Sequence, residues 1–433
     1  MNRKIKLFMM CFLILAMTFS ASSCASYPYR LNLMRNPGVI SETDTDPFID
    51  IHKAEQGTDV DVFYATSREP SSKKDIEPFY TNRRDNVLRL GLATVQFGDK
   101  NVTWEELKEQ SLLEHRQKKY PLEVIKIEEF GVLNTSLSVL NPDRNTPEAK
   151  KPAEEFIIDI NKKLDETKSK NIYIFVGGVR VNFENPVLVA AELWHYMGYR
   201  GVFFAFPWPA TPGAIFSYST DLETAIYSSR DLRLLLEFLA SETKVEKINI
   251  IAYSAGTRVV ASALKDMRLK YLADDRSALR KRLKIGQVAL ISGDLNKDDF
   301  GAFFDDGFHE IPETMTLYMS RIDAVLGFAT WILRYQRLGN LTEEKLLPEV
   351  SEYLRTHDDL VAIDVTNAKY SRSENGHGYF INSPWVSSDI LLSMTLNIPP
   401  GERGLVRKEG KGIWTFPPSY IKRLQIETEN NNR

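Results

Sequence analysis

Residues 247–267 read KINIIAYSAGTRVVASALKDM, a short apolar run that turns abruptly into an amphipathic one. The first six residues include three isoleucines, which is typical of a strand buried on both faces of a sheet. From Thr257 onward the apolar residues recur every three or four positions, as they do on one face of a helix. Small residues surround Ser254 between the two runs. The sequence therefore predicts a strand, a sharp turn at Ser254 and a helix.

The turn has the composition of a nucleophile elbow, in which a strained serine stands between a strand and a helix. Ala252 and Gly256 lie two residues before and after Ser254. Small residues are needed at those positions because the backbones there nearly touch. The turn would lift the Ser254 hydroxyl above the sheet, and the amide of Ala255 would become an oxyanion donor. The alternative is a serine that only caps an ordinary helix after a parallel strand.

The chain around this turn alternates between apolar strands and amphipathic helices from residue 154 to residue 425. Such alternation favours the α/β class, with a mostly parallel sheet covered by helices on both faces. Besides 247–252, we expect strands at residues 171–176, 201–206, 286–291, 314–319 and 360–365.

A serine nucleophile needs a base, and three histidines follow Ser254 in the chain. His377 lies beyond the last expected strand, in the glycine-flanked loop SRSENGHGYF, so its imidazole can approach the turn. His309 precedes a strand and would lie at the opposite end of the sheet. His357 stands in the charged segment THDD, where a solvated side chain is the simpler interpretation. Position therefore favours His377 as the base.

Two aspartates are candidates for the acid that orients the histidine. Asp323 follows the strand at 314–319, and Asp294 follows the strand at 286–291. The carboxyl ends of parallel strands face one crevice, so both are placed for the role. We expect Asp323, because the penultimate strand usually carries the acid. Asp294 is the alternative, although it could instead cap the helix that follows it.

A second oxyanion donor is expected in the loop after the strand at 171–176. The chain reads IFVGGVRVNF there, and Gly177 and Gly178 let the backbone turn sharply. The N–H of Val179 would then face the same site as the N–H of Ala255.

The chain also contains YATSR at 64–68, FPWP at 206–209 and GHGY at 376–379. Together these motifs resemble those of a family of bacterial α/β-hydrolases of unknown function. The resemblance covers about residues 60–395 and implies the α/β-hydrolase fold with a Ser–Asp–His site carried by Ser254, Asp323 and His377. It implies no particular substrate. Gly177 replaces the histidine of the family, and Ala252 and Ala255 are further departures within the elbow.

The N-terminus has the pattern of a secretory signal. Basic residues precede the apolar run Leu7–Phe19, which is too short to span a bilayer. Small residues and Cys24 follow, as in the lipobox of bacterial lipoproteins. We expect residues 1–23 to be a signal peptide, Cys24 to be lipidated, and the protein to be anchored at the cell envelope after secretion. The alternative is an ordinary signal cleaved near Ser23, which would leave Cys24 as a free thiol.

The remaining chain divides by composition. Prolines, charges and the lack of apolar periodicity in NPDRNTPEAKKPA indicate a linker. We therefore expect a tether at 24–46, a strand-rich accessory sub-domain at 47–140, the linker at 141–153, a catalytic domain at 154–425 and a disordered tail at 426–433.

The composition narrows the function. A net charge of −3 gives no reason to expect nucleic-acid binding, and no metal or nucleotide motif predicts a cofactor. We expect a hydrolase of acyl esters or thioesters whose partners are a small acyl or lipid substrate and the membrane. The alternative, motivated by Gly177, is an inactive hydrolase fold that serves as an envelope binding or scaffold protein. Trp194, Trp208 and Trp331 suit either an apolar acyl pocket or the core.

Overall fold

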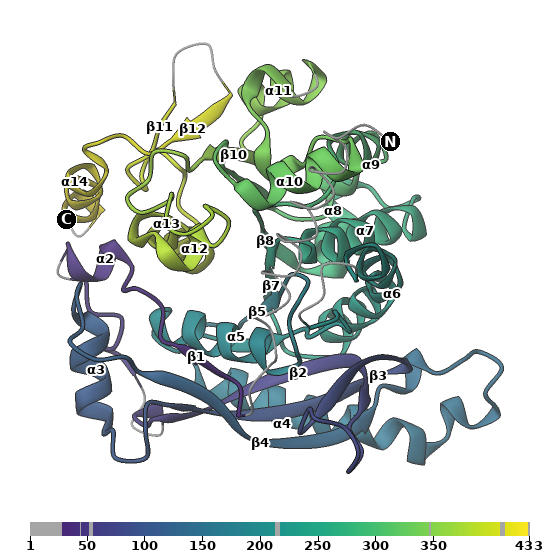
Figure 1. The fold of residues 1–433 in the computed structure, drawn as a ribbon. Helices are drawn as coiled ribbons and strands as arrows, with labels where there is room; N and C mark the ends of the chain where they lie inside the picture. The colour runs from purple at the N-terminus through teal and green to yellow at the C-terminus, as the bar shows by residue number, and fades with distance from the viewer. Residues whose placement is uncertain are drawn as a thin grey trace, which may run out of the picture.

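The computed structural model describes residues 28–43, 45–51, 55–212, 217–345, 348–407 and 412–431. Its strands are β1 (Arg30–Asn32), β2 (Asp59–Pro70), β3 (Tyr80–Phe97), β4 (Pro121–Val132), β5 (Asn171–Val176), β6 (Val202–Ala205), β7 (Lys247–Tyr253), β8 (Ile285–Ile291), β9 (Thr314–Met319), β10 (Leu360–Asp364), β11 (Val406–Arg407) and β12 (Ile413–Thr415). They form one sheet in the order β1-β4-β3-β2-β6-β5-β7-β8-β9-β10-β12-β11 (Figure 1). The strands from β2 to β12 in that order run parallel. The strands β3, β4, β1 and β11 pair in antiparallel fashion.

Helices cover both faces of this sheet (Figure 1). One face packs against α4 (Pro147–Glu166), α6 (Tyr218–Glu242), α7 (Gly256–Lys270), α8 (Arg276–Leu283), α9 (Lys297–Asp305) and α11 (Pro348–Thr356). The other packs against α2 (Gly38–Ser41), α3 (Trp104–Leu112), α5 (Glu184–Tyr196), α12 (Tyr379–Asn382), α13 (Pro384–Leu396) and α14 (Tyr420–Asn431). The predicted α/β class and the mostly parallel sheet are therefore confirmed.

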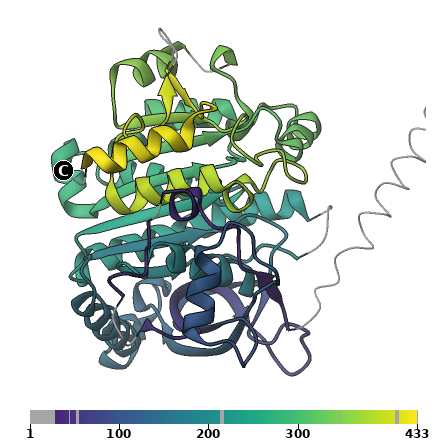
Figure 2. The same cartoon turned by 90° about the vertical axis from the view of Figure 1, so that its left-hand side faces the viewer.

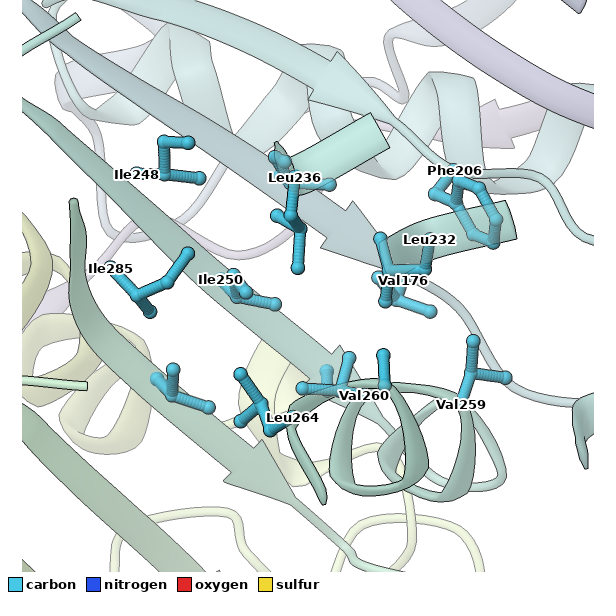
Figure 3. Packing of buried hydrophobic residues seen from close by; sticks show 14 of the residues in the cluster. Val176, Phe206, Leu232, Leu236, Ile248, Ile250, Val259, Val260, Leu264 and Ile285 are labelled. Atoms are coloured by element: carbon cyan, nitrogen blue, oxygen red, sulfur yellow. The ribbon is translucent and has the colours of Figure 1, made fainter. Parts of the chain in front are cut away.

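Alternate residues of each central strand enter opposite cores, which is why these strands read as continuous apolar runs. In β5, Ile172, Ile174 and Val176 join the first core, whereas Tyr173 and Phe175 join the second. Figure 3 shows Val176 among the leucines of α6 and the valines of α7 in the first core.

The N-terminal strands do not form a separate unit. Residues 47–140 are rich in strands as predicted, but β2 pairs in parallel with β6, with Phe63 opposite Phe204 and Tyr64 opposite Ala205. β3 and β4 then extend the same sheet. The expected accessory sub-domain is thus a continuation of the main sheet, because the apolar faces of β2 and β3 complete the two cores.

The predicted linker at 141–153 is wrong, because most of that segment is helical. A short 3-10 helix spans Pro142–Asn145, and α4 begins at Pro147. The Thr146 side chain accepts from the amide of Ala149 and caps α4. A proline in the first helical turn removes no hydrogen bond, so Pro147 favours a helix start here.

The predicted tether at 24–46 also differs from the structure where its residues are described. Leu33, Met34 and Ile40 are buried, and the Val39 amide donates to Ser388 Oγ at 2.8 Å. Figure 2 shows α2 beside α13 and α14. The signal segment 1–23 and Cys24 lie outside the described residues.

The predicted disordered tail at 426–433 is wrong for most of its length, since α14 continues through Asn431. Tyr420 and Leu424 are fully buried in the second core and hold the beginning of this helix against the body.

Candidate active site

The turn at Ser254 joins β7 to α7 in a strained conformation. Ser254 has a φ of +54°, in the left-handed region that residues with a side chain seldom adopt. Its amide donates to the Ile291 carbonyl at 2.9 Å, and its carbonyl accepts from Thr257 Oγ1 at 2.6 Å. A Cβ on Gly256 would lie 2.3 Å from the Val176 carbonyl oxygen, so only glycine fits there. These contacts impose the strained turn that the small residues of the sequence predict.

His377 lies between Ser254 and Asp323. Its Nε2 is 2.9 Å from Ser254 Oγ, and its Nδ1 is 2.7 Å from Asp323 Oδ2. All three residues are at least nine-tenths buried. The structure therefore brings together the serine, histidine and aspartate that the sequence favoured, with the histidine between the serine and the aspartate.

The loop that carries His377 is fastened to the strand ends beside it. The Tyr379 hydroxyl accepts from the Ser292 amide and donates to the Tyr318 carbonyl, both at 2.8 Å. Ser292 Oγ in turn donates to the His377 carbonyl at 2.9 Å. The ring of Tyr253 packs against the imidazole with 5.1 Å between centroids, and burial raises the pKa of Tyr253 well above its usual range. Sequence reasoning noticed Tyr379 in the GHGY motif but missed its role, and it missed Ser292 altogether.

Asp323 is held at the beginning of α10 (Ala324–Leu333). Its Oδ1 accepts from the Leu326 amide at 2.9 Å, which leaves Oδ2 for the imidazole. The Asn340 amide group donates to the Asp323 carbonyl at 3.0 Å and fixes the main chain. One carboxylate thus caps a helix and orients His377.

Asp294 lies near the elbow, but its side chain does not contact His377. Its carboxylate accepts from the Tyr218 hydroxyl at 2.8 and 2.9 Å and from Arg258 Nε at 3.1 Å. Arg337, which is 2% exposed, places its Nε 3.7 Å from the same carboxylate. Burial, together with the negative charge of Asp294, raises the pKa of Tyr218. Asp294 is therefore part of a buried ion-pair cluster.

Two backbone amides flank the serine. Ala255 directly precedes α7, and Val179 lies in the loop after β5. The hydrogen bonds found among the described residues leave both amides without an acceptor. A Cβ on Gly178 would lie 2.9 Å from the Cβ of Ser254, so this loop approaches the serine closely. Both amides thus lie on segments that border Ser254.

The loop after β5 is braced by two motifs that sequence analysis quoted without assigning them a role. Trp208, from FPWP, is buried and donates its indole N–H to the Gly177 carbonyl at 2.8 Å. Arg68, from YATSR, is fully buried and donates to the Val181 carbonyl at 3.0 Å. These two contacts hold the loop that contains Gly177 and Val179.

Arg68 also joins this loop to the FPWP segment. Its guanidinium donates to the carbonyls of Pro207, Ala210 and Thr81 at 3.1–3.2 Å. The carboxyl of Glu184 lies within its field, and burial raises the pKa of Glu184 to about 7 although the positive charge of Arg68 opposes that shift. Arg68 thus supplies the positive charge of a buried polar cluster, which consists of these carbonyls and the Glu184 carboxyl, beneath the loop.

The other candidates lie elsewhere. His309 stacks on Phe304 at 4.0 Å, where burial lowers its pKa to about 4, and His357 stacks on Tyr353 at 3.9 Å. Trp194 is buried in the second core, whereas Trp331 is 60% exposed.

The described residues contain neither a metal-binding cluster nor a membrane-spanning helix. They hold no group of three or more His, Cys, Asp or Glu side chains that could bind a metal ion. Within the same residues, no helix combines the length and apolar character needed to cross a bilayer.

Comparison with known proteins points to one family. The family model described as alpha/beta hydrolase of unknown function (DUF900) matches residues 153–394, more than half of the chain. No protein with a curated description matches significantly. A crystal structure of a lipase-esterase related protein from Clostridium acetobutylicum ATCC 824 aligns at 14% identity over 61% of this chain and 95% of its own. Its TM-score of 0.19 is too low to establish a shared fold.

Proposed function

The chain belongs to the family of α/β hydrolases of unknown function (DUF900), and on that premise we propose that it is a serine hydrolase of acyl esters or thioesters. The observation that carries the proposal is the continuous hydrogen-bond path from Ser254 Oγ through His377 to Asp323. Such a path activates a hydroxyl that is otherwise a weak nucleophile.

The proposed reaction has two halves. His377 Nε2 accepts the hydroxyl proton as Ser254 Oγ attacks the carbonyl carbon, and the carbonyl oxygen becomes an oxyanion. The amides of Ala255 and Val179 donate to that oxyanion, and their position beside a helix N-terminus and a tight loop supports this role. The imidazolium then protonates the leaving alcohol or thiol as its bond to carbon breaks. Water, deprotonated by His377, hydrolyses the acyl-serine in the second half and releases the acid.

Asp323 holds the imidazole in the tautomer with hydrogen on Nδ1 and stabilises the charged form. The replacement of the family's histidine by Gly177 removes no proton-transfer group in this scheme. The contacts of Trp208 and Arg68 with the loop support the view that its geometry is kept without that histidine.

We further propose that Cys24 is lipidated and that the enzyme acts at the cell envelope. The pattern of the first 24 residues supports this location. Metabolic labelling with a tagged fatty acid would test it. The label should enter the chain and be lost from Cys24→Ser, and a chain that never takes the label would refute the anchor.

Labelling with a fluorophosphonate probe tests the chemistry, because such probes react efficiently only with serines that a base activates. We expect the protein to be labelled and both Ser254→Ala and His377→Ala to lose the label. Ser262→Ala, on the same helix as the elbow, and His357→Ala are matched controls that should label normally. If the folded wild type takes no label, the enzyme hypothesis fails and a binding or scaffold role becomes the better explanation.

A further inference from the structure

The helix that begins at the proposed catalytic acid has an unusual surface. Five large apolar side chains are exposed within eleven residues of α10 and its C-terminal turn: Val325, Phe328, Trp331, Ile332 and Tyr335, at 38–60% exposure. We call this group the α10 patch. Elsewhere on the described surface the exposed apolar side chains occur singly or in pairs, as is normal for a soluble domain.

The patch faces away from the protein body. Leu326 and Ala329 are the buried residues of α10, and neither belongs to the two cores that hold the other long helices on the sheet. Phe328 and Trp331 stack on one another with 5.9 Å between ring centroids. The helix therefore presents an aromatic ridge to solvent, and within the described residues nothing covers it.

Most of the exposed aromatic side chains among the described residues belong to the α10 patch. Only four aromatic side chains are classed as exposed among the described residues, and three of them belong to the α10 patch. The fourth, Tyr370, lies in the loop after β10. That loop is joined to the start of α10 by a hydrogen bond from the Ala324 amide to the Asn375 carbonyl at 3.0 Å. The ridge thus adjoins the loop that carries His377.

The only charged residue within the span of the patch, residues 325–335, is a cation. Residues 324–342 contain no acidic side chain, although the chain as a whole has a net charge of −3. Arg334 is exposed at the end of α10, and it makes no ion pair among the described residues. Tryptophan and tyrosine beside arginine are the residues that settle at the boundary between lipid headgroups and acyl chains.

We propose that α10 docks the protein onto the surface of an anionic phospholipid bilayer. Phe328, Trp331 and Ile332 would enter the boundary between headgroups and acyl chains, and Arg334 would remain among the headgroup phosphates. Because Asp323 caps α10, the docked helix would begin at the proposed catalytic acid. The docking itself does not depend on the proposed chemistry.

The test uses the full chain with Ser254→Ala, so that binding is separated from catalysis. The apolar run Leu7–Phe19 could bind vesicles by itself, so total binding is not the measurement. Instead, the fluorescence of Trp331 is obtained as the difference from a Trp331→Phe partner. Vesicles contain phosphatidylcholine and phosphatidylglycerol, with or without bromine on the acyl chains.

We expect the Trp331 signal to shift to shorter wavelength on the vesicles and to be quenched by brominated lipid. Replacing Phe328 and Ile332 by serine should weaken the vesicle affinity reported by Trp331 at least about tenfold. A control double variant, Ile158→Ser with Ile226→Ser, removes two isoleucines of α4 and α6 that are more exposed, at 64% and 63%, and it should change nothing.

Three results would overturn the proposal. The first is a Trp331 signal that brominated lipid does not quench. The second is an equal loss of affinity in the control double variant. The third is a Trp331 signal already shielded from acrylamide in water, which would mean that a second copy or another part of the chain covers the patch.

Discussion

Replacing Arg68 by methionine should strongly destabilise the fold and slow the proposed reaction together. Methionine keeps the unbranched apolar stem but removes the guanidinium that donates to the carbonyls of Thr81, Val181, Pro207 and Ala210. Four such charge-assisted bonds would exceed about 6 kcal/mol if they simply added. The guanidinium also loses its hydration on burial, so we expect a net loss of about 3–5 kcal/mol in the free energy of unfolding.

Urea denaturation followed by tryptophan fluorescence measures this loss, and the rate of fluorophosphonate labelling measures the effect on the loop that carries Val179. Arg68→Lys keeps the charge but not the planar fork, and it should fall between wild type and methionine. Arg83→Met is the control, because Arg83 forms exposed ion pairs with Glu69 and Asp75 that contribute little. A loss below about 1 kcal/mol for Arg68→Met, with unchanged labelling, would refute this account of Arg68.

Three further predictions concern the elbow, the acid and pH. Asp323→Asn should slow labelling about 10⁴-fold, whereas Asp294→Asn should keep the rate within about tenfold and lower the melting temperature; the reverse pattern would make Asp294 the acid. Gly256→Ala should lower the free energy of unfolding in urea titration by about 2–3 kcal/mol, because the added Cβ meets two backbone oxygens at 2.3 and 2.5 Å. Gly327→Ala is the control and should be harmless, since a Cβ there has no atom within 4 Å. Equal effects of the two substitutions would contradict the clash. Burial raises the pKa of Glu184 to about 7, so its contribution to stability is present below pH 4.5 and lost as pH rises through 7. Glu184→Gln should therefore gain about 2.5 kcal/mol relative to wild type between pH 5 and pH 8 in thermal melts, and parallel pH profiles would exclude this effect.

The sequence predicted the central sheet because a strand that is buried on both faces reads as a continuous apolar run. β5 and β9 begin and end at the residues expected, since their apolar runs stop where the chain leaves the two cores. The strand–turn–helix pattern indicated Ser254, and the positions of Asp323 and His377 after the later strands indicated the other two residues. The structure brings all three within hydrogen-bond distance. Their catalytic role stays a prediction.

Contacts of side chains with backbone carbonyls produce no recognisable pattern in the sequence. Arg68 and Trp208 act on main-chain oxygens far away in sequence, and any residue can supply a carbonyl. The same limit explains the N-terminal segment, where Val39 donates to Ser388, 349 residues away in the chain. Its apolar residues are too few to show a period, so the sequence indicated a tether. Around Pro147 the prolines and charges indicate a linker, whereas in the structure they belong to the beginning of α4.

The extent of the sheet determines whether the segment that matches the family model could fold without the rest of the chain. Residues 153–394 contain β5 to β10, and without the rest of the chain β6 and β10 would end as bare edges ready to pair with other chains. In this protein β2 covers the first edge and β12 covers the second. The sheet then terminates in β1 and β11, which are three and two residues long and offer little template for a further strand. We therefore expect the segments outside the family match to keep the sheet from pairing with other chains, and we expect the matched segment alone not to fold as a soluble unit.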